Sequence, residues 1–505
     1  MLTTERFMIY APKEARTKDS ILILWDKVNE GSEKLKYDVY VNEELFSTVD
    51  CTDITLTELN PDSEYSVQIK VNNGRCVLAT EKICVKTKKE GSIYNILDFG
   101  AKSDEVNTEA IQKAIDSCEE GGIVYIPEGT YYSGALFLHS DMTIELARDA
   151  RLVGTGKKED FEPFYYPYEG RWEKCYASLL NVRTKSKYAN EDTPQYSFDE
   201  YKNISIIGEG IIDGNGETLF RDELEDRAII SRGRTVCIRN TTGLYIYGVT
   251  VRNSPAWCLH MIYCKNMTVN QISLYNKFDE EGKLYSHFNG DGIDPDSCQD
   301  IFICHSYIQS QDDSIALKSG REPLGLKLAQ PTKNVRISNC TLSYGFGVVV
   351  GSEMSGSVKN VLIQDINMEE TYCAVNIKTR RNRGGEVSDI TYENIKMKLC
   401  ATVHEDTKWF RGALCIDQFY GDDIADYETK MPVDNGTSTI RNITVKNVDM
   451  ELTNRYGIYL CGLPEKHPEN IELENISIKG SEGCFIKNID NVKMSKVKTK
   501  SSFAG

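Results

Sequence analysis

The sequence predicts an all-β protein, in which a right-handed parallel β-helix follows a small N-terminal β-sandwich domain. Three observations favour this fold class. A weak repeat of Asn or Asp followed by an apolar residue runs from residue 200 onward, short strand-like runs crowd the N-terminal part, and one segment has a convincing helical period. At 505 residues the chain exceeds the usual size of a single core, so one large and one small domain are expected.

The small domain is expected over residues 13–88, where strand-like runs alternate with turn residues. The runs are Ile21–Trp25, Tyr37–Val41 and Tyr65–Val71. These runs, with a Trp in an early strand and a Tyr after a Pro-containing turn, resemble a fibronectin type III sandwich. The resemblance implies a spacer or packing module, and the charged residues 86–91 form the expected linker.

One helix is expected near residues 108–118. Asn107 stands at its N-cap position, Gly121-Gly122 follows its end, and one face is apolar. The residues of that face are Ala110, Ile111, Ala114, Ile115 and Cys118. The terminal coil of a solenoid must be covered, so we expect this helix to close the N-terminal end of the stack.

The repeat predicts the β-helix itself, over residues 93–505. It occurs at Asn203, Asn266, Asp300, Asn334, Asn360, Asp389, Asn442, Asn470 and Asn491. From Asn266 the successive spacings are 34, 34, 26, 29, 53, 28 and 21 residues, the length of one or two solenoid coils built from strands. Such an elongated stack with loops on one face forms a groove that suits a polymer chain.

Composition restricts the partners and the compartment. The net charge of −17 argues against nucleic acid, which needs a basic face. No apolar run is long enough for a membrane span, and the charged N-terminus lacks the apolar core of a signal peptide. The 16 cysteines form no C-x-x-C pair, so we expect reduced thiols in a cytoplasmic protein, with Cys237, Cys264, Cys304 and Cys340 pointing inward.

The densest chemical segment runs from Asn289 to Lys318. Asp291 and Asp312 lie 21 residues apart, about one coil, so they should stack on the same face beside Asp313. Carboxyl groups this close raise one another's pKa, so one can stay protonated while another stays ionised, as glycosidic cleavage requires. Asp294 and Asp296, in the same segment, are interpreted as turn-forming or calcium-binding residues.

Four short motifs resemble the polygalacturonase family of glycoside hydrolases, family 28, whose signatures are Asn-x-Asp, Asp-Asp, Gly-His-Gly and Arg-Ile-Lys. This sequence has Asn289-Gly290-Asp291, Asp312-Asp313, Gly345-Phe346-Gly347 and Asn376-Ile377-Lys378. The flanks Gly290–Ser297, Gly351–Gly356 and Lys378–Arg381, and the stretch Asn253–Trp257 with His260, are similar to exo-acting bacterial members. The resemblance covers roughly residues 93–505.

The resemblance implies roles for the aspartates. Asp312 would be the general acid, and Asp291 and Asp313 would hold and deprotonate the attacking water in an inverting reaction. Lys378 would bind a substrate carboxylate, and Asn289 would orient the catalytic carboxylates. No metal or cofactor is expected.

Further substrate-binding candidates are Lys318, Arg321, Arg380, His260, Glu353, Tyr420 and Phe346. The cations among them fall on the same coils as the aspartates and could bind an acidic sugar despite the negative net charge. For Arg381 and Arg383 a solvated charge is an equal alternative. Phe346 and Asn376 replace the His and the Arg of the family motifs, which favours a modified substrate.

These observations predict an exo-acting hydrolase that releases galacturonic acid from pectin-derived oligogalacturonides. The exo mode follows from the flanking motifs and from the insertion Phe161–Phe198, which could close one end of the groove. Alternatives are a galacturonidase acting on rhamnogalacturonan or other modified pectin fragments, a pectate lyase using calcium, and a non-catalytic pectin-binding β-helix. The oligomeric state is left open.

Overall fold

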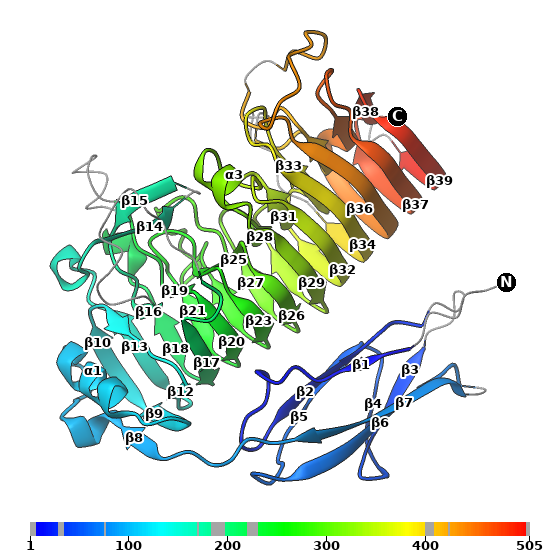
Figure 1. Ribbon diagram of the computed structural model, residues 1–505. Coiled ribbons are helices and arrows are strands. Elements are labelled where there is room, and N and C mark those ends of the chain that lie inside the picture. Colours follow the sequence, from blue (N-terminus) through cyan, green and yellow to red (C-terminus); the bar gives the residue numbers. More distant parts are fainter. Residues whose placement is uncertain are drawn as a thin grey trace.

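The computed structural model describes residues 7–28, 35–74, 77–168, 171–182, 197–219, 231–398, 409–422 and 425–500. Within these ranges the chain forms a long stack of β-coils with a small β-domain packed against its side (Figure 1). The predicted fold class, a parallel β-helix with a small N-terminal β-domain, is confirmed. The described part contains no helix of the length and apolarity needed to cross a membrane. Residues 1–6, on which the signal-peptide prediction rests, lie outside the described ranges.

Each coil of the β-helix contributes strands to three parallel ladders. The first ladder contains β8 (Ile93–Asn95), β9 (Gly122–Ile126), β12 (Met142–Leu146), β17 (Tyr201–Gly208), β20 (Thr241–Tyr247), β23 (Lys265–Asn270), β26 (Gln299–Cys304), β29 (Thr332–Ser338), β32 (Val358–Glu369), β34 (Glu386–Lys398), β36 (Thr439–Cys461), β37 (Glu469–Ser481) and β39 (Asp490–Lys500).

The second ladder contains β10 (Gly129–Ser133), β13 (Ala150–Gly154), β18 (Ile211–Asp213), β21 (Thr250–Arg252), β24 (Ser273–Tyr275), β27 (Tyr307–Gln309) and β30 (Thr341–Ser343), and continues in the second halves of β32, β34, β36, β37 and β39.

The third ladder contains β11 (Leu136–Phe137), β16 (Leu180–Val182), β19 (Val236–Arg239), β22 (Leu259–Ile262), β25 (Ile293–Asp296), β28 (Ile315–Leu317), β31 (Val348–Gly351), β33 (Val375–Lys378), β35 (Gly412–Asp417), the end of β36 and β38 (Cys484–Lys487).

The Asn and Asp residues of the sequence repeat sit near the starts of first-ladder strands in a left-handed backbone conformation. All nine positions have φ between 49° and 58°. Asn and Asp tolerate this conformation better than other non-glycine residues. Their side chains also bond across coils: the Asn360 amide donates to Asn334, and the Asn334 amide donates to Asp300. The repeat therefore marks the corner at which β17 and, from β23 onward, every first-ladder strand begins.

Alternation along the third ladder separates the core from the functional surface. Ile293, Ile315 and Val348 occupy one paired row and point into the stack, where they are fully buried. The residues between them along each strand point outward, and these include Asp296 and Lys318, which face each other across β25 and β28. The outer face of the third ladder thus carries the charged residues singled out in the sequence.

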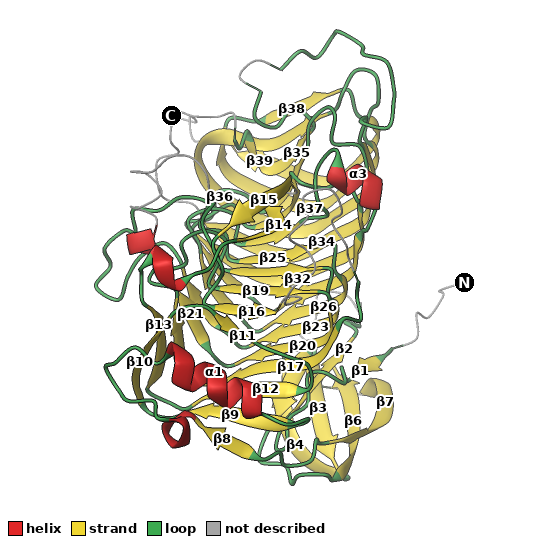
Figure 2. Ribbon diagram, turned by 60° about the vertical axis from the view of Figure 1, so that its left-hand side comes forward, coloured by secondary structure: helices red, strands yellow, loops and turns green. Residues whose placement is uncertain are grey.

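The predicted helix is α1 (Thr108–Ser117), which covers the N-terminal end of the stack beside the 3₁₀ turn η1 (Ile96–Phe99) (Figure 2). Ile111, Ala114 and Ile115 are buried against the first coils, as the apolar face predicted. Asn107 stands at the N-cap but does not cap the helix through its side chain. That amide bonds the backbone of the preceding loop instead.

The N-terminal domain is built from two antiparallel sheets. One contains β1 (Ile9–Tyr10), β2 (Ile21–Trp25) and β5 (Asp53–Leu56); the other contains β4 (Glu44–Val49), β3 (Lys36–Val41), β6 (Glu64–Asn72) and β7 (Val77–Lys86). Trp25 and Tyr37 pack in the core between the sheets, with ring centroids 5.4 Å apart. The fibronectin type III assignment stays a prediction.

The N-terminal domain docks on the outer face of the first ladder. Leu22 and Leu24 pack against Tyr245 and Cys304, and the Arg336 guanidinium donates to the Trp25 carbonyl at 2.6 Å. Cys304 therefore faces outward beneath this domain, which corrects the expectation that it points inward. Residue spacing alone could not reveal a second layer covering the coil.

The predicted insertion Phe161–Phe198 begins directly after the 3₁₀ turn η2 (Lys158–Asp160), and its described part forms a hairpin on the outer face of the third ladder. The hairpin contains β14 (Phe164–Tyr168) and β15 (Arg171–Cys175), while the short helix α3 (Leu324–Leu328) lies farther along the stack. Trp172 and Phe164 pack against Cys237, Ile262 and Tyr263. Cys237 thus also points outward, contrary to expectation, whereas Cys264 and Cys340 lie in the core as predicted.

Candidate active site

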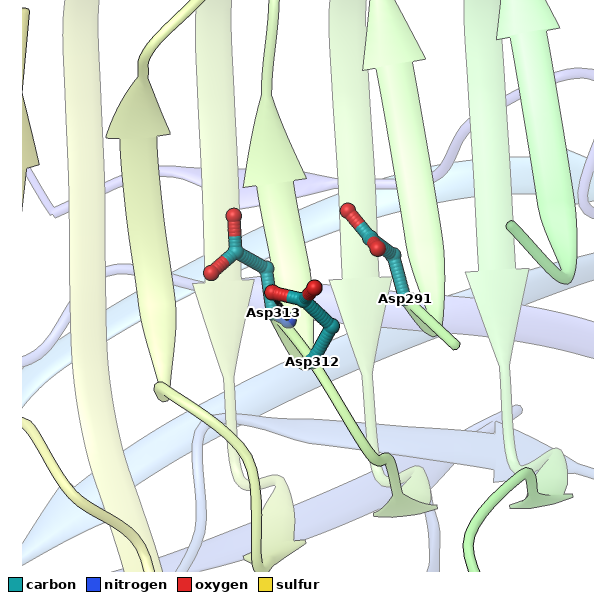
Figure 3. Close-up of side chains that lie close together, drawn as sticks. All are labelled: Asp291, Asp312 and Asp313. Carbon is teal, nitrogen blue, oxygen red and sulfur yellow. Dashed lines mark hydrogen bonds between the residues drawn. The ribbon is translucent and has the colours of Figure 1, made fainter. Parts of the chain in front are cut away.

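Three aspartates meet at the turns that precede two neighbouring strands of the third ladder (Figure 3). Because Ile293 pairs with Ile315, Asp291 and Asp313 occupy equivalent positions of adjacent coils, and Asp312 lies one residue earlier. One carboxylate oxygen from each aspartate lies within 4.8 Å of the others. The structure therefore brings together the residues predicted from their spacing, with Asp313 rather than Asp312 in register with Asp291.

The aspartates open into a cavity of about 300 Å³. Its lining contains Trp257, Asn289, Asp291, Asp312, Asp313, Lys318, Arg321, Ser352, Glu353, Lys378, Arg380, Arg383, Trp409, Tyr420 and Gly421. Most sequence-predicted site residues are among them. Phe346 and His260 are not.

Lys378 neutralises Asp313. Its ammonium lies 3.0 Å and 2.8 Å from the two carboxylate oxygens, and both side chains are buried. Although burial alone would lower it, Asp313 raises the pKa of Lys378, so the lysine stays charged. The structure thus places the lysine predicted to bind substrate on one of the three clustered carboxylates.

Lys318 neutralises Asp291 from the other side. Its ammonium lies 3.4 Å from Asp291, 3.3 Å from Glu353 and 4.2 Å from the ring centre of Trp257. Lys318 is only 3% exposed, so its ammonium interacts mainly with carboxylates of the protein itself. Burial raises the pKa of Asp291. The charges of Asp294 and Asp312 raise it further, whereas the charge of Lys318 lowers it.

Asp312 has no ion-pair partner among the described residues. Burial, followed by the charge of Asp313, raises its pKa to about 6. Its side chain accepts only the Asp313 backbone N–H, at 3.0 Å. Beside it, a Cβ on Gly345 would lie 2.2 Å from the Asp312 carbonyl oxygen, so only glycine fits there. The trio therefore contains one carboxyl disposed to keep its proton and two with adjacent ammonium groups.

A second group of charges supports this arrangement. Lys318 and Arg383 lower the pKa of Glu353 to about 2, against the effect of burial. Arg383 donates to Glu322 at 2.7 Å and to the Ser352 carbonyl at 2.9 Å, and Arg321 lies 3.5 Å from Glu322. These guanidinium groups thus link Glu322 to Ser352 and fix the position of this side of the cavity.

Arg380 is the exception among the cations of the cavity. It is exposed, and its guanidinium has no hydrogen-bond or ion-pair partner among the described residues. For Arg381 the sequence left substrate binding and a solvated charge as equal alternatives. In the structure its guanidinium binds Glu465 at 2.7 Å and 2.9 Å. It is not among the residues that line the cavity.

The remaining predicted residues occupy defined positions. Asn289 accepts from Arg232 at 2.9 Å, which fixes its amide at the rim. Tyr420 lines the cavity and packs edge-on to Trp409, with ring centroids 5.4 Å apart. His260 lies fully buried beneath Trp257, and burial lowers its pKa to about 4.

Phe346 packs beside the cavity in an aromatic cluster with Tyr372 and Phe410, with centroids 5.3 Å and 5.0 Å away. Its backbone N–H donates to the Asp312 carbonyl at 3.3 Å. The Lys378 ammonium lies 5.9 Å from its ring centre. The residue thus adjoins the aspartates while its ring faces other aromatic rings.

Sequence reasoning missed Trp257, Trp409 and Ser352 as lining residues. Trp257 stood in a quoted motif, but nothing in its spacing showed that it would face Lys318. Asp294 was interpreted as a turn residue, whereas it lies within β25 on the outward row beside Asp291. The alternation of apolar and acidic residues from Gly292 to Asp296 was the available signal.

Fold and site together define a β-helical protein with a cluster of carboxyl groups in a cavity, the kind of site that glycoside hydrolases use to cleave a glycosidic bond. The sequence matches "Glycosyl hydrolases family 28" over residues 179–501, and "Rhamnogalacturonase A/epimerase, pectate lyase-like" over residues 93–159. The chain belongs to glycosyl hydrolases family 28 and is a glycoside hydrolase.

Relatives of both cleavage modes are similar to the chain. An exo-poly-α-D-galacturonosidase of Dickeya chrysanthemi is 27% identical over 431 residues, which cover 76% of this chain and 67% of that protein. An endo-polygalacturonase of Pectobacterium parmentieri is 25% identical over 407 residues, covering 76% and 87%. The family 28 exopolygalacturonase structure from Yersinia enterocolitica superposes with a TM-score of 0.79 at 20% identity, covering 98% and 97%.

Proposed function

We propose that the protein is an exo-acting hydrolase that releases galacturonic acid from pectin-derived oligogalacturonides with inversion of configuration. The observation that carries the proposal is the carboxyl trio at the bottom of a cavity lined by five Lys and Arg side chains. The relatives named exo-poly-α-D-galacturonosidase and exopolygalacturonase support this substrate and mode.

In the proposed reaction Asp312 donates its proton to the leaving glycosidic oxygen. Asp291 and Asp313, each beside a lysine ammonium, orient a water molecule and accept its proton as the water attacks the anomeric carbon. The product leaves with the opposite anomeric configuration, and no covalent sugar–enzyme intermediate forms. After product release the base carboxyl loses its proton to solvent and Asp312 takes up a proton from solvent, which restores the starting protonation.

The exo mode is supported by the hairpin of β14 and β15. It packs on β19 and β22, so the outer face of the third ladder is covered on the N-terminal side of the catalytic coils. A long chain could not continue along this face past the hairpin. Only a chain end would then reach Asp312.

The acidic substrate is supported by Arg380. The other four cations of the cavity are all in ion pairs with protein carboxylates. Arg380 therefore offers the guanidinium that can pair with a uronate carboxylate without displacing a protein partner.

The test combines three measurements on purified protein with polygalacturonate and trigalacturonate. We expect monomer from the start, a slow fall in viscosity, and inverted configuration of the first product by NMR. Rapid viscosity loss at low conversion would contradict the exo mode, and retained configuration would contradict the mechanism. Ultraviolet absorbance of an unsaturated product would instead identify a lyase, and no turnover on any pectic substrate would favour a non-catalytic binding protein.

A second candidate, cleavage of rhamnogalacturonan or otherwise modified pectin fragments, is favoured by Phe346. The half-buried Phe346 ring forms an aromatic cluster with Tyr372 and Phe410 beside the cavity, and such a cluster can offer an apolar face to a neutral sugar. We expect Phe346→His to shift the ratio of kcat/KM toward plain oligogalacturonides, while Phe302→His, remote on the first ladder, leaves it unchanged. Equal changes on both substrate types would mean that Phe346 only packs. A cytoplasmic location stays a prediction, which cell fractionation would test.

A further inference from the structure

Asp294 is a fourth carboxyl group directly behind the catalytic trio. It lies on β25, three residues after Asp291, and its side chain is completely buried. Neither of its carboxylate oxygens accepts a hydrogen bond from any described donor. An ionised carboxylate in such a place would carry a large desolvation cost without compensating hydrogen bonds.

The neighbours of Asp294 limit the ways in which that cost can be removed. The Lys318 ammonium lies 3.6 Å away, beyond hydrogen-bonding distance, and it is shared with Asp291 and Glu353. Asp291 faces the same ammonium, at 3.4 Å, so the two carboxyl groups meet at one cation, and two carboxylates cannot bond each other without a proton. The geometry is that of a carboxyl–carboxylate pair.

The charges of the surrounding cluster point the same way. Five neighbouring carboxyl groups (Asp291, Asp294, Asp312, Asp313 and Glu353) face three cations (Lys318, Lys378 and Arg383). Two further pairs leave the formal balance unchanged: Arg321 with Glu322, and the buried Arg234, which also acts on Asp294, with the buried Asp296. Neutrality therefore requires two protons, of which one belongs to the general acid Asp312.

We propose that Asp294 holds the second proton and donates it as a hydrogen bond to Asp291, so that Asp291 remains the ionised base. The choice between the two groups follows from exposure. Asp291 lines the cavity, where substrate water can reach it, whereas Asp294 has no exposed surface. Burial raises the pKa of both carboxyl groups, that of Asp294 to about 7, so the pair retains a proton, and its position within the pair follows from exposure alone. Asp294 is thus a positioning residue, and this role rests on the proposed function of Asp291 as a base.

The proposal predicts opposite results for two substitutions of nearly equal size. Asparagine can turn its NH₂ toward Asp291 and its oxygen toward Lys318, so Asp294→Asn reproduces the protonated acid. We expect it to keep kcat within about threefold and to leave the acidic limb of kcat/KM in place. Asp294→Leu removes the donor and should lower kcat about 10–150-fold, the loss of a charge-assisted hydrogen bond.

The pH profile separates this role from simple packing. Without its donor, Asp291 ionises less readily, so the acidic limb should move upward by about one to two pH units in Asp294→Leu. KM should change little. Asp296→Asn is the matched control: Asp296 lies on the same strand and accepts the Gly320 N–H at 2.8 Å. That variant should lose thermal stability without moving the acidic limb.

The opposite outcome is equally specific. If Asp294 is ionised, Asp294→Asn removes a negative neighbour of Asp291, and the acidic limb moves downward; that result overturns the proposal. Should Asp294→Leu fail to fold, Asp294→Asn alone decides. Infrared difference spectra give a readout independent of turnover, because Asp294→Asn should remove one protonated-carboxyl band near neutral pH. If the wild-type protein shows that band but hydrolyses no galacturonide, the proposed function fails while the protonation of Asp294 stands.

Discussion

Replacing Lys378 by methionine distinguishes two roles for a lysine in the cavity. Methionine preserves most of the side-chain volume and removes the charge. If Lys378 is the counter-ion of Asp313, as their contacts of 2.8 Å and 3.0 Å indicate, the variant leaves a buried carboxylate without compensation. If Lys378 binds the substrate carboxylate, as the family motif implies, the protein itself should be little affected.

The structure sets the size of the effect. Both partners are less than a tenth exposed, so breaking the pair should cost about 3–5 kcal/mol of folding stability unless Asp313 takes up a proton. Protonation relieves that cost but removes a carboxylate from the water-activating pair. The expected loss in kcat is therefore about 10²–10⁴-fold, the usual contribution of a positioned base.

The assay measures kcat, KM and thermal unfolding from acidic to neutral pH, with trigalacturonate and a neutral aryl galactoside. Lys487→Met is the control, since Lys487 lies in the same outward row and pairs with the exposed Glu428. The counter-ion role predicts a loss in kcat on every substrate that is cleaved. An unchanged kcat with a raised KM for acidic substrates alone would refute it and restore the substrate-binding role.

Two further predictions follow from the same structure. Asp312→Asn should lower kcat about 10²–10⁴-fold. The pKa of Asp312 is raised from 3.8 to about 6 by burial and Asp313, so its ionisation costs stability as pH rises through this window; the variant should unfold at a higher temperature than wild type at pH 7 but not at pH 4. The alkaline limb of wild-type kcat/KM should accordingly lie near pH 6, and full activity far above it would argue against Asp312 as the acid. Deleting residues 1–88 should lower the melting temperature and solubility by exposing Tyr245 and Cys304 while leaving KM unchanged; a tenfold rise in KM at constant melting temperature would instead make that domain part of the substrate site.

The fold could be predicted because its determinants are local and repeated. From β23 onward the Asn and Asp corners recur once per coil with the same backbone conformation, so a weak pattern summed over nine positions indicates a solenoid. The helix α1 was visible from its apolar face and its flanking glycines. The outward direction of Cys237 and Cys304 was not, because it depends on layers added from distant segments: the hairpin over β19 and the N-terminal domain over β26.

The site could be predicted in its members but not in its pairings. One-coil spacing brought Asp291 near Asp312 and Asp313, and the cations were correctly placed on the same coils. Which cation meets which carboxylate depends on the strand register and on side-chain direction. Asp313, not Asp312, is in register with Asp291, and this shift by one residue assigns Lys378 to Asp313 and leaves Asp312 without a partner. The ion pairs that support the proposed acid and base roles thus depend on a register that no single-sequence pattern specifies.

The pairings also change how a protein of net charge −17 can handle an acidic sugar. A cluster of cations beside the aspartates suggested a surface that attracts substrate. Instead, Lys318, Lys378 and Arg383 are buried and face protein carboxylates, so their charges set protonation rather than attract the chain. Recognition of a uronate then falls to few groups, with Arg380 foremost, and only within contact distance. A site of this kind loses little by the negative field around it, because salt screens that field beyond about 8–10 Å. The net charge and an acidic substrate are therefore compatible, since the charges that matter for binding are local and the others serve the catalytic carboxyls.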